Sequence, residues 1–350
     1  MRKTRQILVG DVKIGGGAPV SIQSMTNTDT ADVNATMAQI RQLAGAGCQI
    51  VRCAVQNHAA LAPFGEICRQ SPIPVVADIH FDHTLAVAAL EHGAACVRVN
   101  PGNLRTEDAA REVARKALEL GRSVRIGVNM GSLSKEAEAK YGRTAEAMVA
   151  SAQHYVQLFE DEGCRALKVS LKASDVRTTI QACRMFAEKS DIPLHLGITE
   201  AGPVSCGIVK SAVGIGALLL DGIGDTMRVS LTAPPVEEIK AAIRILEATG
   251  LRKAEPEIIS CPTCARTRID LMRLVSAVEK AIDELKASGH KIKVGKIAVM
   301  GCEVNGPGEA ADADIGIAGA ANKGGILFRK GQKIATLEAD ELLPALLREL

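Results

Sequence analysis

Residues 74–103 read PVVADIHFDHTLAVAALEHGAACVRVNPGN, and this stretch contains the unit that decides the fold. A short run rich in Val begins it, a segment rich in Ala and Leu follows, and a second short run, CVRVN (96–100), comes near its end. Short β-branched runs predict strands, whereas apolar residues spaced three and four apart predict helices. The stretch is therefore a predicted strand–helix–strand unit.

The same alternation extends in both directions from this unit. Eight predicted strands lie between residues 20 and 231, at 20–26, 49–55, 74–79, 96–100, 123–129, 166–172, 193–199 and 226–231. Each is followed by a helical stretch, and one βα unit typically takes about 30 residues. Near-continuous apolar strands indicate a parallel sheet covered on both faces, and no Gly-rich dinucleotide or phosphate loop follows any of them. Eight such units predict a (β/α)₈ barrel of the TIM type.

Two further segments flank the predicted barrel. The stretch VGDVKIGGGAP (9–19) predicts a hairpin that plugs the barrel floor, and RKAEPE (252–257) is typical of a linker. Beyond it, strands alternate with two helices and a Gly-rich loop, which predicts a small α+β domain. The expected fold is thus α/β, with the barrel in residues 1–250 and the small domain in residues 251–350.

Composition narrows the function classes. The 350 residues carry a formal charge of +2, with 5 Phe, 2 Tyr and no Trp. Nucleic-acid proteins usually show a basic surplus and stacking aromatics, so we expect no nucleic-acid partner. No signal-peptide core and no run approaching the ~18 apolar residues of a membrane span occurs, so we expect a cytoplasmic protein without a membrane partner. Ten cysteines in that compartment are expected to be thiols or metal ligands.

Three cysteines near the C-terminus suggest a metal centre. Cys261 and Cys264 form a CxxC in a turn, and Cys302 follows a predicted strand in GCEVNGPGEA. A CxxC alone is equally a redox dithiol or half of a zinc site, but a third Cys in a Gly/Pro-rich loop favours a metal. The set lacks a fourth ligand.

Two metals with different fourth ligands remain open on the residues alone. Zinc would take His290, whereas an iron–sulfur cluster would take Glu303 or Glu309. Glu309 follows Gly306, Pro307 and Gly308, which can bend the chain back toward the metal, whereas Glu303 is adjacent to Cys302.

Cations inside apolar strands suggest a second site in the barrel. Five strands contain one each, near the carboxyl half, namely Arg52, Arg98, Arg125, Lys168 and Arg228. Active sites of barrel enzymes occupy that face, so inward side chains would converge on one pocket. With Lys172 the cations number six, whereas the candidate carboxylates are Asp78, Glu200, Asp221 and Asp225. Either these charges neutralise one another, or the Arg forks bind an anion such as phosphate.

Uncharged and titratable side chains surround these cations. Asn100, Asn129 and Ser170 are candidate hydrogen-bonding groups, and His80 is a candidate acid–base or positioning group. Glu200, directly after the seventh strand, is the best candidate for proton transfer.

Seven motifs carry a family resemblance: SIQSMTNTDT (21–30), ADIHFD (77–82), RVNPGN (98–103), GITEAG (197–202), GDTMRVSLT (224–232), SCPTCAR (260–266) and GCEVNGPGEA (301–310). Together they closely resemble the 4-hydroxy-3-methylbut-2-enyl diphosphate synthase family of the methylerythritol phosphate route to isoprenoids. The resemblance covers the chain from about Gln6 to the C-terminus. The compact length of the chain resembles the bacterial two-domain form of the family.

The resemblance implies a two-electron reductive ring opening and dehydroxylation of 2-C-methyl-D-erythritol 2,4-cyclodiphosphate. It implies one 4Fe-4S cluster per chain at Cys261, Cys264, Cys302 and Glu309. It also implies a homodimer, in which the cluster domain of one subunit closes over the barrel of the other, and flavodoxin or ferredoxin as electron donor.

In this interpretation the barrel cations hold the cyclic diphosphate, Glu200 donates a proton, and His80 and Asp78 have positioning roles. The alternatives are a zinc-stabilised barrel transferase or aldolase acting on a phosphorylated substrate, and a barrel scaffold with an electron-transfer or docking module.

Overall fold

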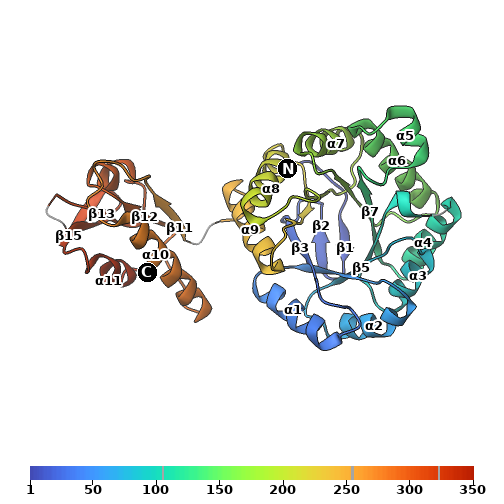
Figure 1. Ribbon diagram of the computed structural model, residues 1–350, viewed down its shortest axis with the longest axis horizontal. Coiled ribbons are helices and arrows are strands. Elements are labelled where there is room, and N and C mark those ends of the chain that lie inside the picture. The colour runs from blue at the N-terminus through green and yellow to red at the C-terminus, as the bar shows by residue number, and fades with distance from the viewer. Residues whose placement is uncertain (105, 254–255, 322–323) are drawn as a thin grey trace. The chain divides into compact units, whose positions relative to one another are not determined.

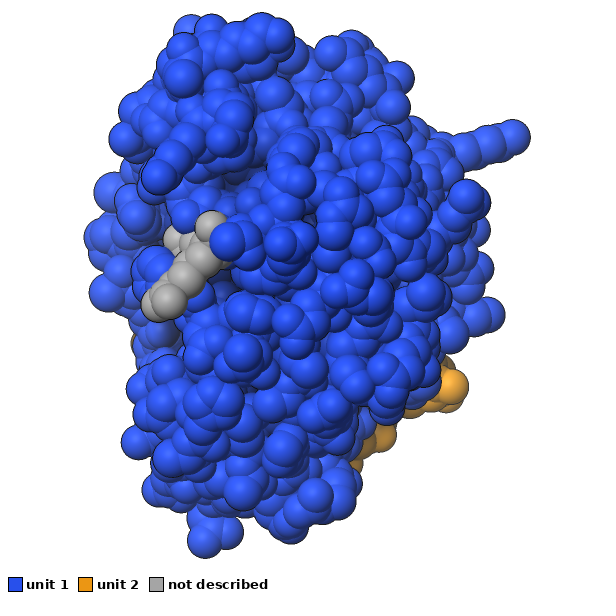
Figure 2. All heavy atoms as spheres, turned by 90° about the vertical axis from the view of Figure 1, so that its right-hand side faces the viewer, with its two compact units in different colours: residues 1–252 blue, residues 253–350 orange. Residues whose placement is uncertain are grey.

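The computed structural model describes residues 1–104, 106–253, 256–321 and 324–350, so residues 254 and 255 of the predicted linker lie outside the described residues. The chain divides into two compact units, Met1–Arg252 and Lys253–Leu350, which Figure 2 distinguishes by colour. Each unit has a hydrophobic core of its own. In the described part of the chain no helix is both long enough and apolar enough to cross a membrane.

The sheet of the first unit is a closed ring of parallel strands. These are β3 (Ser21–Met25), β4 (Ile50–Ala54), β5 (Val75–Asp78), β6 (Cys96–Val99), β7 (Ser123–Asn129), β8 (Leu167–Lys172), β9 (His195–Leu196) and β10 (Thr226–Met227). Each lies within a predicted stretch. The sheet order is β8-β7-β6-β5-β4-β3-β10-β9, and a bridge between Val169 and Leu194 joins its two ends. The predicted (β/α)₈ barrel is confirmed.

Helices surround this ring on all sides (Figure 1). They are α1 (Val33–Gly45), α2 (Leu61–Gln70), α3 (His83–Glu91), α4 (Glu107–Glu119), α5 (Lys135–Tyr141), α6 (Ala145–Asp161), α7 (Val176–Lys189), α8 (Val204–Leu220) and α9 (Pro235–Ala248). Several begin where the sequence offers a side-chain cap: Asp32, Thr106, Thr144 and Asp175 each accept a backbone N–H of the first turn. At these four helices the sequence therefore defines where the loop ends and the helix begins.

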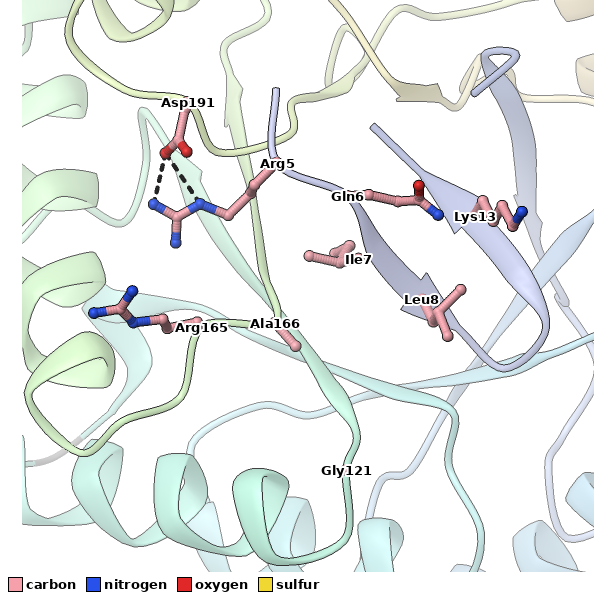
Figure 3. A pocket seen from close by; sticks show the side chains of 9 residues that line it. All are labelled: Arg5, Gln6, Ile7, Leu8, Lys13, Gly121, Arg165, Ala166 and Asp191. Atoms are coloured by element: carbon pink, nitrogen blue, oxygen red, sulfur yellow. Dashed lines mark hydrogen bonds and ion pairs between the residues drawn. The ribbon is translucent and has the colours of Figure 1, made fainter. Parts of the chain in front are cut away.

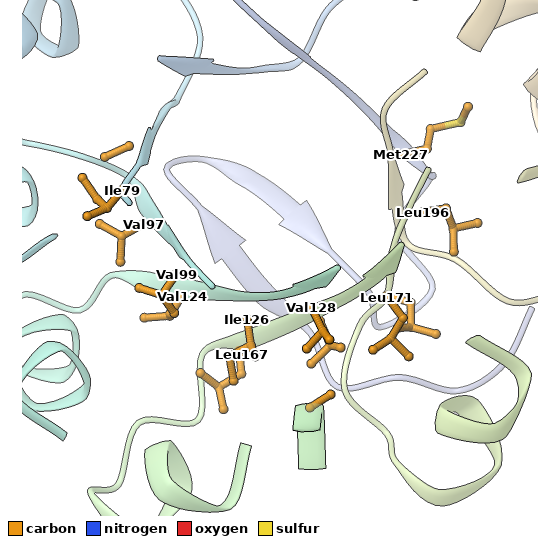
Figure 4. Close-up of a cluster of buried hydrophobic side chains, with 14 of the residues drawn as sticks. Ile79, Val97, Val99, Val124, Ile126, Val128, Leu167, Leu171, Leu196 and Met227 are labelled. Carbon is orange, nitrogen blue, oxygen red and sulfur yellow. The ribbon is translucent and has the colours of Figure 1, made fainter. Parts of the chain in front are cut away.

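Strand side chains alternate between the helices and the barrel interior. Val124, Ile126 and Val128 of β7 point outward, away from the ring of strands, as Figure 4 shows, and pack in the main core. Because successive residues of a strand face opposite sides, Arg125, Gly127 and the other intervening residues face the lumen. The charges that the sequence places in the strands therefore lie inside the barrel.

The hairpin closes the amino-terminal end of the barrel, as predicted. Its strands are β1 (Ile7–Val9) and β2 (Val12–Ile14), which pair antiparallel. Ile7, Val9 and Ile14 pack against Ile50, Val76 and Cys96, which lie at or near the starts of β4, β5 and β6. The lumen is therefore sealed by apolar contacts below and can admit a ligand only from the carboxyl ends of the strands.

The second unit is a five-stranded mixed sheet with helices. Its elements are β11 (Glu257–Ser260), α10 (Leu271–Ala287), β12 (Lys296–Met300), a π-helical turn (Val304–Glu309), β13 (Ile315–Gly319), β14 (Gly325–Arg329), β15 (Gln332–Leu337) and α11 (Leu342–Leu347). β11, β12 and β13 are parallel, whereas β14 and β15 run antiparallel. This is the predicted α+β organisation.

Candidate functional site

A row of four charged residues crosses the barrel lumen. Asp78 of β5 pairs in register with Arg98 of β6, Arg98 with Arg125 of β7, and Arg125 with Lys168 of β8. All four side chains are buried. The barrel therefore brings four of the predicted residues together on adjacent strands.

Two of these cations lie deeper than the sequence suggested. Arg125 is the third of seven residues in β7, and Lys168 is the second of six in β8, so both occupy the amino half of their strands. The expectation that all five cations sit near the carboxyl half is wrong for these two, because β7 and β8 continue to Asn129 and Lys172. The lumen thus has a lower level with Arg125 and Lys168 and an upper level that opens to solvent.

Asp78 is the central carboxylate of the upper level. Its Oδ2 lies 3.7 Å from Nε of Arg52 and 3.4 Å from Nε2 of His80, and its Oδ1 lies 3.4 Å from Nη1 of Arg98. Burial by itself would raise the pKa of Asp78, but Arg52, His80 and Arg98 outweigh it and hold the pKa well below its usual range. Asp78 is therefore ionised and positions two guanidinium groups.

Glu238 of α9 is a buried carboxylate that the sequence analysis missed. Its two oxygens accept hydrogen bonds from Nε and Nη2 of Arg228 at 3.2 and 3.1 Å. They also accept hydrogen bonds from Ser24 Oγ and from the backbone N–H of Leu231, both at 3.1 Å. A bidentate carboxylate holds a guanidinium in a fixed plane, so Glu238 sets the orientation of Arg228.

Two of the four predicted counter-charges, Asp221 and Asp225, do not pair with the lumen cations. Asp221 ends α8 and forms an ion pair with Arg184 at 2.7 Å. Asp225 precedes β10 and accepts hydrogen bonds from Thr4 and from the backbone of Leu194, on the hairpin side of the barrel. The signal that could have identified Glu238 as the buried carboxylate is helical periodicity. Glu238 shares the buried face of α9 with Ala242 and Ile245, whereas Glu237 does not.

The lower level contains buried polar atoms that no described residue satisfies. They are Nε and Nη1 of Arg125, Nζ of Lys168, Nε2 of His195 and both amide atoms of Gln23. Burial, followed by the charges of Arg52 and Arg98, lowers the pKa of Arg125. Burial also lowers the pKa of Lys168. Unpaired buried polar groups cost free energy, so the lumen is suited to a polar or anionic occupant.

Charge balance in the lumen favours an anion. Six basic side chains line it: Arg52, Arg98, Arg125, Lys168, Lys172 and Arg228. Within the described ranges, the carboxylates that form ion pairs with them are Asp78 and Glu238. The charges therefore do not neutralise one another, which was the alternative reading of the strand cations.

The polar side chains at the rim of the lumen differ in availability. Asn100 is engaged in its own loop, since its Nδ2 donates to Ser132 Oγ at 2.7 Å and its Oδ1 accepts from Gly102. Asn129 ends β7 in register with Lys172, and Ser170 is buried on β8 beside Gly127. Asn100 therefore shapes the wall, whereas Asn129 and Ser170 face the space between β7, β8 and β9.

Two turns above the lumen have strained backbone. Glu200, three residues beyond Gly197, has φ +53°, and Phe81, directly after His80, has φ +65°. Non-glycine residues rarely adopt this left-handed conformation, and such strain tends to occur at functional sites. Glu200 is exposed at the carboxyl end of the barrel, where a ligand would enter.

The predicted metal ligands lie on neighbouring loops of the second unit. Cys261 follows β11, and Cys302 follows the adjacent parallel strand β12. The backbone N–H of Gly301 donates to Sγ of Cys261 at 3.2 Å, and the N–H of Arg268 donates to the carbonyl of Gly301 at 2.9 Å. These bonds tie the CPTC turn to the start of the Gly-rich loop.

The chemistry of these donors suits a thiolate-bound metal, although the donors are not gathered. Cys261, Cys264 and Cys302 are free thiols. The backbone N–H of Arg266 and the charge of its side chain lower the pKa of Cys264, which favours the thiolate. Glu309 ends the π-helical turn that follows Cys302. Across the described residues no three His, Cys, Asp or Glu side chains are close enough to hold a metal ion.

A cavity of about 790 Å³ lies at the opposite end of the barrel from the lumen opening (Figure 3). It is lined by the hairpin and by Arg165, Lys13 and Arg5, and Arg5 is paired with Asp191 and Glu160. These side chains are exposed or already paired, so the cavity, despite its size, is not the candidate site for the anion.

Comparison with known proteins identifies a family over most of the chain. A family model described as the GcpE TIM-barrel domain matches residues 4–243, and a second, the GcpE protein C-terminal domain, matches residues 257–350.

Curated relatives match along their whole length. A protein of Geobacter sulfurreducens is 52% identical over 99% of this chain and 97% of its own, and one of Thermodesulfovibrio yellowstonii is 50% identical over 100% and 98%. Both are named 4-hydroxy-3-methylbut-2-en-1-yl diphosphate synthase (flavodoxin).

Solved structures share the barrel fold at low identity. The 7,8-dihydropteroate synthase of Vibrio fischeri covers 71% of this chain and all of its own at 12% identity, with a TM-score of 0.52. The N-acetylneuraminic acid synthetase of Leptospira borgpetersenii covers 83% of this chain and 99% of its own at 14% identity, with a TM-score of 0.51.

Proposed function

The chain belongs to the GcpE family, and from this premise we propose that it forms 4-hydroxy-3-methylbut-2-en-1-yl diphosphate from 2-C-methyl-D-erythritol 2,4-cyclodiphosphate. The reaction opens the cyclic diphosphate and removes a hydroxyl group. Counted on the neutral acids, two electrons and two protons enter and one water leaves. The observation that carries the proposal is the buried, carboxylate-poor set of cations in a lumen that opens at the carboxyl ends of the strands.

The diphosphate would bind at the upper level of the lumen. Glu238 fixes the plane of Arg228 through two hydrogen bonds, and Asp78 pairs with one nitrogen each of Arg52 and Arg98. Other N–H groups of these guanidinium groups would bind phosphate oxygens. Arg125 and Lys168 add positive potential from below. The substrate-binding set of this proposal is Arg52, Arg98, Asn100, Arg125, Asn129, Lys168, Ser170 and Arg228, with His80 and Asp78 at its edge.

Glu200 is the proposed proton donor of the reaction. It sits on the strained turn beyond Gly197, at the same end of the barrel as His80 and Asp78. A carboxyl group held there can deliver a proton to the oxygen that departs as water.

The second unit would hold one 4Fe-4S cluster through Cys261, Cys264, Cys302 and Glu309. Such a cluster supplies the two electrons one at a time when bound. The chain's own contribution is a set of free thiols on hydrogen-bonded loops, with a backbone N–H directed at the Cys261 sulfur. Hydrogen bonds to ligand sulfurs are one way in which proteins tune clusters.

The electron donor would be flavodoxin, which the relatives' names include, or the functionally similar ferredoxin. We place the reaction in the cytoplasm, where all ten cysteines would remain thiols, as they are here. The zinc-dependent transferase or aldolase is not favoured, because the full-length relatives are named as the synthase.

A homodimer is part of the proposal, and the surface of α8 supports it. Val204, Ile208, Val209, Val213 and Leu220 are exposed on this helix, and Lys210 is its only charged residue. A groove of about 400 Å³ runs between α8 and α9, with Ile208, Ala241 and Ile245 in its lining. Exposed apolar surface of this kind is typical of subunit interfaces, and a second copy presents the same face, as a two-fold dimer requires.

The test uses anaerobically prepared protein with reduced flavodoxin and the cyclic diphosphate, and follows the product by ³¹P NMR. We expect turnover, about four irons and four sulfides per chain, and loss of turnover in Glu200→Gln with the cluster retained. Arg98→Met should raise KM, whereas Arg165→Met, an exposed cation at the other end of the barrel, should leave it unchanged. Stoichiometric zinc without sulfide, or equal effects of the two Arg variants, would refute the proposal.

A further inference from the structure

We propose that Lys172 couples substrate binding to the uptake of a proton: its side chain is a neutral amine in the empty barrel and becomes an ammonium when the cyclic diphosphate binds. This inference rests on the proposed function of the same lumen. It concerns the charge state of the site before and after binding, which the identity of the reaction does not determine.

The position of Lys172 places its amine among cations. It ends β8, and its side chain reaches toward β9, where a Cβ on Gly197 would collide with Nζ. The charged groups around it come from every neighbouring part of the barrel: Arg52 on β4, Arg98 on β6, Arg125 on β7 and Arg228 at the end of β10. Within the described chain, Lys172 forms no ion pair. Its surroundings therefore oppose a positive charge.

The carboxylates that face this space are already committed. Asp78 pairs with Arg52 and Arg98, and Glu238 binds Arg228 through both oxygens. His195 on β9 and His80 after β5 are further titratable groups at the lumen, whereas Cys183 on α7 lies outside the ring of strands, in the core behind β8. Neither carboxylate is left to compensate an additional ammonium.

Among the basic residues of the lumen, a lysine can reduce the repulsion between positive charges by losing its proton. An arginine stays protonated in proteins, whereas a lysine amine readily loses its proton when buried. Burial, followed by the charges of Arg125, Arg228, Arg52 and Arg98, lowers the pKa of Lys172 well below its usual value. Lys172 is partly exposed at the carboxyl end of β8, whereas Lys168 is fully buried in the amino half of the same strand, farther from the opening.

The arrival of the substrate reverses this balance. A cyclic diphosphate carries two negative charges, and an opposite charge within about 4–6 Å raises the pKa of an amine by one to several units. Nζ then takes one proton from solvent, an N–H bond forms, and no group of the substrate changes. Because the bound state holds one more proton, Kd should rise up to tenfold per pH unit through the interval between the free and bound pKa of Lys172.

The test is titration calorimetry of the full-length holoprotein with the cyclic diphosphate between pH 7 and 9. Each titration is repeated in HEPES and in Tris, whose heats of ionisation differ, so the buffer dependence of the heat gives the number of protons taken up. We expect between about half and one proton, and a Kd that rises with pH.

Three variants locate the proton. Lys172→Arg keeps a permanent charge, so it should bind without proton uptake and with a flat pH profile, and Lys172→Met replaces it if circular dichroism shows that the Arg variant is misfolded. Lys168→Met, on the same strand, and His80→Asn should both retain the uptake. If the unchanged protein binds the substrate without taking up a proton, or if the Lys172 variants take up as many protons as the unchanged protein, this inference is wrong but the proposed function stands. Absence of binding would overturn it together with the proposed function.

Discussion

Removal of the Glu238 carboxylate should destabilise the barrel unit strongly. Glu238→Ala deletes the acceptor of four hydrogen bonds, two from Arg228, one from Ser24 and one from the backbone of Leu231. The guanidinium of Arg228 would then remain in the lumen wall without its counter-ion. Breaking a buried ion pair in this way costs about 3–5 kcal/mol.

The structure places the expected loss at the lower end of that range. The Arg228 side chain is 18% exposed, so water can reach part of the guanidinium once Glu238 is gone, whereas the Glu238 side chain is only 4% exposed. We expect a loss of about 3 kcal/mol, which for a unit of this size corresponds to a fall in Tm of roughly 6–12 °C.

The assay is differential scanning calorimetry of the full chain, with urea unfolding as a second measure. Glu237→Ala is the matched control, because Glu237 precedes Glu238 on the same helix, its side chain is 42% exposed, and its ion pair among the described residues is with Lys240, three residues on. Its loss should stay below about 0.5 kcal/mol.

A double variant separates an unpaired charge from simple loss of packing. Glu238→Ala combined with Arg228→Met removes both charges, so it should be more stable than Glu238→Ala alone. Equal stability of Glu238→Ala and Glu237→Ala, or a double variant less stable than Glu238→Ala, would refute the role assigned to this ion pair.

Three further predictions follow from other groups. The pKa of Asp78 is lowered on folding, so its ionised carboxylate stabilises the folded protein above its unfolded pKa of about 3.9, and this stabilisation is lost as pH falls below that value. Asp78→Asn should therefore lower Tm at pH 7 and make Tm less dependent on pH in the acid range. Lys168→Met should raise the free energy of unfolding by about 1–3 kcal/mol in urea titrations, because Nζ is buried without a partner; a loss of stability would contradict this. If the proposed dimer forms through α8, Val213→Arg should give monomers in sedimentation experiments, whereas Leu118→Arg, on the exposed face of α4, should not change the oligomeric state.

The barrel could be predicted from the sequence because its signal is local and repeated. Each strand is a short β-branched run and several helices begin at a side-chain cap, so the eight βα units can be recognised one at a time. The hairpin was predictable for the same reason, since Gly10, with φ +61°, marks the tight turn between β1 and β2.

The site was only partly predictable, because the pairing of side chains depends on where elements meet. The sequence identifies Arg125 and Lys168 as strand cations, and the predicted bounds of their strands already place both in the amino half. Which residues of neighbouring strands lie beside them follows only from the register. It likewise cannot pair Arg228 with Glu238, since that contact joins a strand end to the buried stripe of the following helix. Asp225 was an equally plausible partner in sequence, yet it lies on the hairpin side of the barrel.

The two proposed sites differ in how completely the chain alone can build them. The lumen charges stand on a closed ring of hydrogen-bonded strands, so their positions are set before any ligand arrives. Cys264 and Glu309 lie instead on turns, which the backbone bonds of Gly301 only partly restrain. Metal binding contributes to the folding of such loops, so in the proposed cluster site the free energy that gathers these ligands would come from the metal itself. For this reason the CPTC motif indicates which residues would bind a cluster, although the protein without metal does not bring them together. In the barrel, by contrast, the fold alone brings the charged residues together.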